Sequence, residues 1–127
     1  MAFLGQLALV TFGAAAGGVL RYFVSGFIGR RIGEAFPWGT LVVNMTGSFA
    51  IGVMAAFVRG PISDVWLFGV TGLLGAYTTV SSFSLQTLAL AREGGQRQAF
   101  NNVAFSVAFS LAAAALGYAL AAAAAPL

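Results

Sequence analysis

The chain carries at positions 72–84 the stretch Gly72-Leu73-Leu74-Gly75-Ala76-Tyr77-Thr78-Thr79-Val80-Ser81-Ser82-Phe83-Ser84. Two glycines and a run of hydroxyl side chains here interrupt a longer segment that is otherwise apolar enough to cross a lipid bilayer. In hydrocarbon an unpaired backbone carbonyl costs several kcal/mol, so non-helical backbone persists there only where protein buries it, water reaches it or an ion binds it. The interruption is therefore where we expect the function of the chain to be located.

The composition around this stretch is that of an integral membrane protein. Of the 127 residues, 60% are apolar, while only six are basic and three acidic. A spanning helix needs about 20 predominantly apolar residues. Four segments fit, and we expect an all-α integral membrane protein, a single domain over residues 1–127, with four transmembrane helices and a glycine-broken third helix. The predicted spans are residues 4–28, 38–58, 65–90 and 100–124.

The charges fall almost entirely between these spans. A net charge of +3 spread over short connections, without a basic cluster, argues against nucleic-acid binding. The first and third connections hold Arg30, Arg31, Arg92 and Arg97, whereas the second holds Arg59. The positive-inside rule then places both termini outside the cytoplasm, in a multi-pass protein of the cell (inner) membrane.

The side-chain inventory excludes most chemistry. Histidine and cysteine are absent, and the three carboxylates (Glu34, Asp64 and Glu93) lie in the connections. No protected acid and base pair, transition-metal site or intramembrane proton carrier can be assembled from this set. We therefore do not expect an enzyme.

The polar groups that remain inside the spans are neutral. Asn44 shares a helix face with Gly47, Ser48 and Ile51, at i, i+3, i+4 and i+7. An asparagine in hydrocarbon either hydrogen-bonds a neighbouring helix or donates to a passing solute, and both interpretations stay open. Neutral amides, hydroxyls and ring edges suit a small anion, because they replace part of its hydration without trapping it.

Three further features have structural interpretations, and two of them concern helix packing. Gly13 and Gly17 have the spacing that lets a neighbouring helix approach closely. In the fourth segment, Asn102, Ser106 and Ser110 recur at i+4, which we attribute to helix packing. Arg21 either extends to the membrane interface or creates positive potential at a pore mouth.

Taken in order, three stretches resemble the Fluc/CrcB family of fluoride channels. They are Gly17-Gly18-Val19-Leu20-Arg21-Tyr22, then Pro37-Trp38-Gly39-Thr40-Leu41-Val42-Val43-Asn44 with Gly47-Ser48-Phe49, and finally Gly72-x-x-Gly75-x-Tyr77-Thr78-Thr79-x-Ser81-x-Phe83. The resemblance covers most of the first 84 residues, and the fourth segment fits by length and position.

The resemblance implies an antiparallel, dual-topology dimer with two fluoride pores near the subunit interface. Asn44 matches the pore asparagine, and Phe83 matches the second of two pore phenylalanines. Ser81 and Ser82 match hydroxyl positions beside those rings. The expected fluoride-facing set also includes Ser48, Thr79 and Val80.

The same resemblance implies a structural Na⁺ on the two-fold axis, shared between the subunits. Gly75 and Thr78 match the positions whose backbone carbonyls hold this ion. Arg21 matches a first-helix arginine with a structural or electrostatic part. The expected partners are thus fluoride, Na⁺, the lipid bilayer and a second copy of the chain or a paralogous subunit.

One residue departs from the family pattern, which has phenylalanine where this chain has Val80. Valine lacks the ring edge, so one contact with the anion is lost. The arginine bias is also unexpected for a chain that inserts in both orientations. Both observations fit one subunit of a heterodimeric fluoride channel with an impaired pore.

The leading hypothesis is a passive, selective fluoride channel that exports F⁻ and so reduces fluoride toxicity. Three alternatives stay open. They are the heterodimeric subunit, a small dual-topology multidrug exporter, which would need a membrane-embedded carboxylate, and a non-conducting membrane assembly subunit.

Overall fold

The computed structural model describes residues 2–58 and 60–125, and helices account for most of them. The helices α1, α2 and α6 are each long and apolar enough to cross a membrane, and the third predicted span consists of several shorter pieces. The elements are α1 (Ala2–Ile32), α2 (Trp38–Ala56), α3 (Asp64–Trp66), η1 (Leu67–Leu74), α4 (Gly75–Tyr77), α5 (Val80–Arg92) and α6 (Gln96–Ala124). The predicted all-helical fold is thus confirmed, with longer first and last helices than expected.

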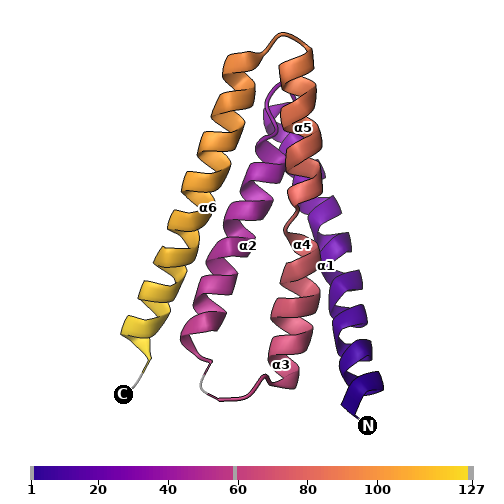
Figure 1. The fold of residues 1–127 in the computed structure, drawn as a ribbon, viewed down its shortest axis with the longest axis vertical. Coiled ribbons are helices and arrows are strands. Elements are labelled where there is room, and N and C mark those ends of the chain that lie inside the picture. Colours follow the sequence, from indigo (N-terminus) through magenta and orange to yellow (C-terminus); the bar gives the residue numbers. More distant parts are fainter. Residues whose placement is uncertain (1, 59, 126–127) are drawn as a thin grey trace.

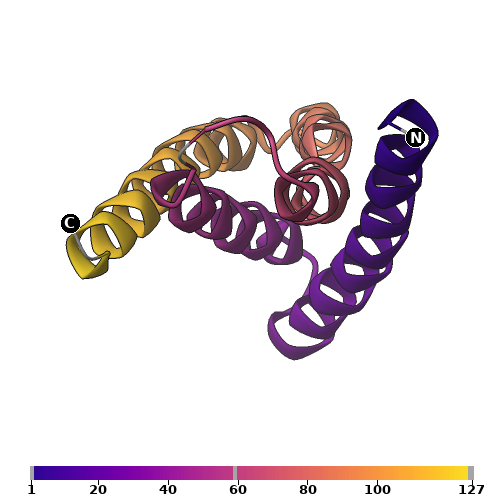
Figure 2. The ribbon, with the colours of Figure 1, turned by 90° about the horizontal axis from the view of Figure 1, so that it is seen from below.

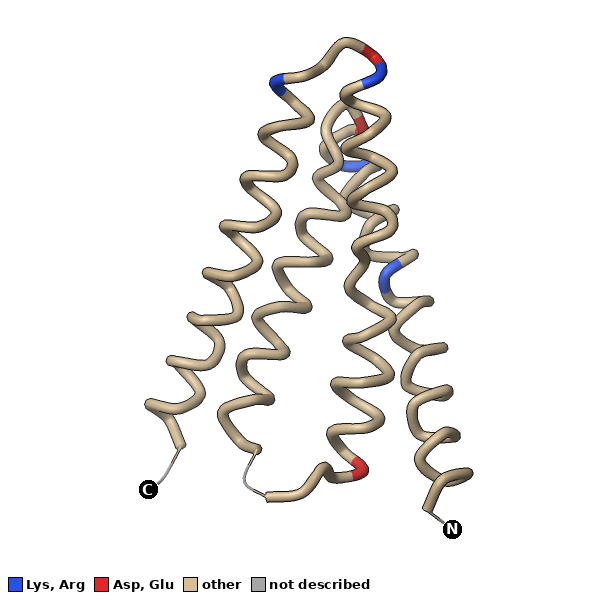
Figure 3. The backbone as a smooth tube through the Cα atoms, viewed as in Figure 1, with Lys and Arg blue, Asp and Glu red and all other residues tan. Residues whose placement is uncertain are grey.

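Both described ends of the chain lie at one end of the molecule, and the α1–α2 and α5–α6 connections lie at the other (Figure 1). Seen along the helices, α2 lies between α6 and the column formed by α3, η1, α4 and α5, while α1 packs against that column (Figure 2). Most arginines gather at the connection end (Figure 3). Arg30 and Arg31 are in the last turn of α1 and Arg92 is in the last turn of α5. Two of the predicted connections therefore share one side, whereas Arg59 lies outside the described residues.

Glycines bring α1 and the third span into close contact. A Cβ atom on Gly13 or Gly17 would collide with backbone atoms of Phe68 or Leu73. Across the same contact, a Cβ on Gly72 of the third span would lie 2.6 Å from the Val10 carbonyl oxygen and 3.0 Å from the Gly13 Cα. The packing interpretation of Gly13 and Gly17 is confirmed.

The third span is interrupted as predicted, but its glycines are not the point of interruption. Gly72 lies within the π-helical segment η1, and Gly75 has helical dihedral angles (φ −61°, ψ −36°). The backbone leaves the helix at Thr78 and Thr79, which are both extended. The description of this helix as glycine-broken was therefore wrong, because Gly72 serves close packing and the threonines form the break.

Little of the chain is buried, and its outer surface is apolar. The buried core is small and centres on Val43, Leu74 and Tyr77. Large apolar side chains are exposed on all the long helices, for example Phe12 (71%) and Phe100 (72%). A surface of this kind is stable in lipid and would aggregate in water, so the chain is a multi-pass membrane protein.

Candidate functional site

The break in the third span consists of two extended residues between two helices. Thr78 has φ −76° and ψ 156°, and Thr79 has φ −149° and ψ 121°. β-Branched side chains such as threonine favour extended backbone. Thr79 then caps α5, since its Oγ1 accepts a hydrogen bond from the Ser82 N–H at 3.1 Å. The break is therefore an ordered transition between two helices.

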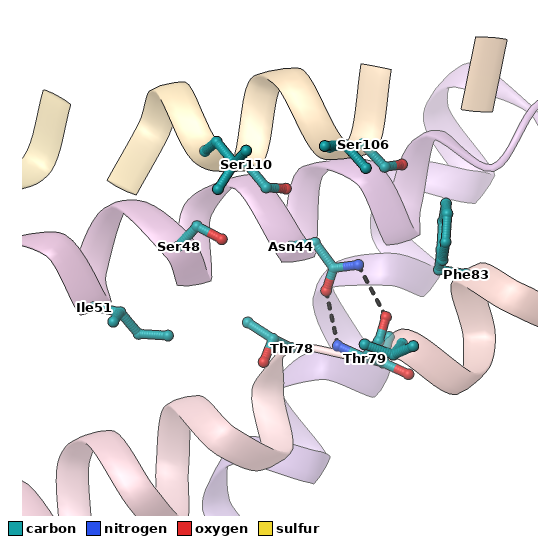
Figure 4. A pocket seen from close by; sticks show the side chains of 11 residues that line it. Asn44, Ser48, Ile51, Thr78, Thr79, Phe83, Ser106 and Ser110 are labelled. Carbon is teal, nitrogen blue, oxygen red and sulfur yellow. Dashed lines mark hydrogen bonds between the residues drawn. The ribbon is translucent and has the colours of Figure 1, made fainter. Parts of the chain in front are cut away.

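The side-chain amide of Asn44 holds this break from α2 (Figure 4). Its Nδ2 donates to the Thr79 carbonyl oxygen at 2.9 Å, and its Oδ1 accepts the Thr79 N–H at 2.7 Å. A primary amide is the neutral side chain that supplies both functions, and this pairing fixes which way the amide points. The helix-bonding interpretation of Asn44 is therefore correct, although its partner is backbone.

Two more contacts fix the break against α2. Gly47 leaves the space that Thr78 and Tyr77 occupy, because a Cβ atom there would collide with Thr78 Cγ2 and lie 3.1 Å from Tyr77 Cδ1. The Tyr77 hydroxyl lies 2.9 Å from Thr46 Oγ1. Since the Thr46 hydroxyl donates to the Val42 carbonyl oxygen at 2.8 Å, Tyr77 is the donor in this pair. The break thus has a defined position on α2.

A cavity of about 400 Å³ lies between α2, the break, α5 and α6. Its walls are mostly apolar, and its polar groups are all neutral amides and hydroxyls. Ser48, Ser106 and Ser110 carry hydroxyls at the wall formed by α2 and α6 (Figure 4). The lining residues are Asn44, Ser48, Ile51, Thr78, Thr79, Val80, Phe83, Ser106, Val107, Ser110 and Leu111.

The cavity brings together most of the predicted fluoride-facing residues. Asn44, Ser48, Thr79, Val80 and Phe83 line it. The two predicted serines of α5 contact the break instead: Ser81 Oγ lies 3.1 Å from Thr79 Oγ1, and Ser82 supplies the N–H that Thr79 caps. Neither serine is among the lining residues.

Three predicted site residues remain, and only Thr78 lines the cavity. Gly75, the other residue predicted to bind Na⁺, is exposed on the single chain. Arg21 is half-buried on α1.

The polar stripe of the fourth span contributes to the cavity, which its helical spacing did not predict. Its first member, Asn102, is 2% exposed and donates to Thr87 Oγ1 at 2.8 Å, which is the expected packing. Ser106 and Ser110, however, line the cavity. Their i+4 spacing was visible in the sequence, but which neighbour they face depends on the rotation of α6.

The cavity can solvate a small ion weakly from several sides. Hydroxyl and amide donors suit an anion, and the N-terminus of the 13-residue helix α5 adds a positive partial charge beside the break. Within residues 2–58 and 60–125, no cluster of three or more histidine, cysteine or acidic residues can hold a metal. The oxygen atoms at this site belong to backbone carbonyls, hydroxyls and a side-chain amide.

Comparisons with known proteins agree with one another. Residues 8–118 match the family described as "CrcB-like protein, Camphor Resistance (CrcB)". The chain is 54% identical over 122 residues to "Fluoride-specific ion channel FluC 2" of Bradyrhizobium diazoefficiens, covering 92% of this chain and 88% of that protein. It is 56% identical over 120 residues to the protein of the same name in Rhodopseudomonas palustris, covering 91% and 92%. A Rhodospirillum rubrum protein named "Fluoride-specific ion channel FluC" is 48% identical over 115 residues, covering 86% and 88%.

Proposed function

Because this chain belongs to the CrcB family, we propose that it is a passive, selective fluoride channel that exports F⁻ and so lowers fluoride toxicity. The observation that carries the proposal is the cavity at the break, whose polar lining is neutral and includes Asn44 and Phe83. Neutral HF crosses membranes and dissociates inside the cell. An inside-negative potential, worth about 2.3 kcal/mol per charge per 100 mV, then drives F⁻ out without ATP.

The donors for fluoride come from α2 and α6. The Asn44 amide carries two N–H groups and uses one on Thr79, so the second is free to donate into the cavity. The Ser106 hydroxyl points to Asn102 Oδ1 at 3.4 Å, which is beyond the usual hydrogen-bond range for two oxygens. Little hydrogen-bond energy is therefore lost when its proton turns towards an anion. The edge of the Phe83 ring adds a weak positive contact.

Backbone carbonyls at the break supply a site that suits Na⁺. In a continuous α-helix the Gly75 carbonyl would accept the Thr79 N–H, but that N–H donates to Asn44 instead. Thr78 precedes the N-cap of α5, so its carbonyl lies outside the hydrogen-bond ladder of that helix. Freed carbonyls at a broken membrane helix are typical Na⁺ ligands. These residues thus fit the structural Na⁺ of the proposal.

The proposed assembly is an antiparallel dimer in the inner membrane, with the breaks of two copies adjacent. Gly75 is exposed, and Val80 is 78% exposed although it follows the break. The chain has no cysteine, so one introduced cysteine reports cleanly on contacts between copies. Val80→Cys should form a disulfide-linked dimer in membranes. Phe3→Cys, which is 73% exposed at one end of α1, should not, because antiparallel copies place it on opposite membrane faces.

A second candidate function is one subunit of a heterodimeric channel with an impaired pore. Val80 favours it, because this residue lines the cavity but offers no ring edge. Co-purification of a similar chain from the native membrane would support this candidate, whereas fluoride flux through the purified single species would contradict it.

Fluoride efflux from liposomes tests the proposed function. Vesicles loaded with potassium fluoride and containing the purified protein are treated with valinomycin, and released F⁻ is recorded with a fluoride electrode in the presence of Na⁺. Rapid efflux supports the proposal. Release no faster than from empty vesicles contradicts it and leaves an assembly subunit as the better interpretation.

A further inference from the structure

A hydrogen-bonded chain behind the cavity wall joins Phe83 on α5 to Asn102 on α6. We propose that Asn102 is the positioning residue of this chain, setting the place of the Phe83 ring. This inference deepens the proposed function, on which it rests, since Phe83 lines the cavity. Asn102 itself does not line the cavity.

The Asn102 amide is joined to Phe83 through Thr87. Asn102 Nδ2 donates to Thr87 Oγ1 at 2.8 Å, and the Thr87 hydroxyl donates to the Phe83 carbonyl oxygen at 2.7 Å. Asn102 Oδ1 lies 3.4 Å from the Ser106 hydroxyl, which is beyond the usual range for two oxygens. Thr87 has one proton and gives it to Phe83, so it must act as the acceptor towards Asn102. The direction of both bonds between Asn102 and Phe83 is therefore determined.

The helix α5 depends on this chain because it has few other constraints. It begins directly after the break, and none of its described residues is buried. In the described part of the chain, the other side-chain hydrogen bond between α5 and α6 lies at their connection, where Gln96 Nε2 donates to the Ala91 carbonyl at 3.1 Å. Asn102, by contrast, is 2% exposed, and its partner Thr87 lies one helical turn from Phe83 on α5. A buried, hydrogen-bonded polar group of this kind favours one arrangement of its neighbours.

Removing either partner of the hydrogen bond between Asn102 and Thr87 should loosen the contact of α5 with α6. Thr87→Val keeps the shape of the side chain and removes the hydroxyl, while Asn102→Leu keeps its approximate volume and removes the amide. Each variant should lower fluoride flux roughly fivefold, the scale typical of residues that act on a site through others. Thr11→Val is the matched control, because the Thr11 hydroxyl also bonds the carbonyl four residues earlier (Leu7, 2.7 Å) but is exposed on α1.

The decisive test observes the ring itself. We would place 4-fluorophenylalanine at position 83 by nonsense suppression, since the chain has 12 phenylalanines, and record its ¹⁹F NMR signal in detergent. Thr87→Val and Asn102→Leu should each shift or broaden the signal, and Thr11→Val should not. The double variant should change it no more than either single one, because both remove the same bond.

Three results would overturn the inference. They are an unchanged signal in the folded Thr87→Val protein, an equal change in Thr11→Val, and additive changes in the double variant. The signal does not depend on conduction, so it separates the two proposals. A protein that carries no fluoride refutes the channel function, while the ¹⁹F comparison still decides whether Asn102 positions the ring.

Discussion

The side-chain amide of Asn44 pairs with both backbone polar groups of Thr79, donating to its carbonyl oxygen at 2.9 Å and accepting its N–H at 2.7 Å. The bond to the N–H replaces the helical bond to the Gly75 carbonyl that the extended Thr79 cannot make, and the bond to the carbonyl oxygen attaches the N-cap of α5 to α2. They also leave the Gly75 carbonyl without its α-helical partner. One side chain of α2 thus stabilises the break, and a backbone carbonyl is left without its helical donor.

Asn44→Asp should destabilise the protein and stop fluoride flux. The carboxylate keeps the acceptor for the Thr79 N–H but repels the Thr79 carbonyl, and an unpaired buried polar group costs about 1–3 kcal/mol. A negative charge at the cavity also repels an anion. Thermal unfolding in detergent and liposome flux measure the two effects. Asn101→Asp, a half-buried α6 position outside the cavity lining, is the control and should keep more of both properties.

Gly47→Ala should displace the break. The added methyl group would collide with Thr78 Cγ2 and crowd the Tyr77 ring, and overpacking typically costs about 1–3 kcal/mol. We expect a lower unfolding temperature together with reduced flux. In Gly69→Ala, where nothing lies within 4 Å of the new Cβ, both should stay near wild type. Equal losses in the two variants would mean that the contact between Gly47 and Thr78 is unimportant.

Val80→Phe should raise fluoride flux. The valine is 78% exposed and lines the cavity, so a larger ring fits without disturbing the core and restores the missing ring edge. Val65→Phe adds the same ring at another exposed position, outside the cavity, and should have no effect. An unchanged rate in Val80→Phe would show that the valine does not limit conduction.

Ser106→Ala and Ser110→Ala should each slow fluoride flux about two- to thirteenfold, the range that corresponds to losing one hydrogen bond of about 0.5–1.5 kcal/mol. Both hydroxyls line the cavity, whereas Ser84 is exposed on α5 and does not. Ser84→Ala is therefore the matched control. Similar flux rates in all three variants would contradict a role of α6 in the ion path.

The sequence predicted the membrane class, the helical fold and the interrupted third span, because composition and apolar run length determine these directly. Within the predicted stretch 72–84, however, the break lies at Thr78 and Thr79 and not at the glycines. A glycine in a membrane helix either breaks the helix or admits a neighbour, and the contact of Gly72 with α1 arises between segments far apart in the chain. The break at Thr78 and Thr79 depends on a partner 35 residues earlier, Asn44, which periodicity within one helix cannot reveal.

The residues of the cavity could likewise be predicted only in part from the sequence. The face of Asn44 and Ser48 was evident from helical spacing, and Phe83 followed from the resemblance to a family. Ser106 was assigned to packing, because a polar stripe has the same spacing whether it contacts a helix or a cavity. Only the packing of α6 against α2 determines which neighbour it meets.

The most direct test of the central claim is valinomycin-driven ion efflux from proteoliposomes loaded with fluoride and, in a parallel sample, with chloride. We expect fast fluoride release, chloride release no faster than from empty vesicles, and loss of the fluoride signal in Asn44→Asp. Equal release of both anions, or fluoride release that Asn44→Asp leaves unchanged, would contradict it.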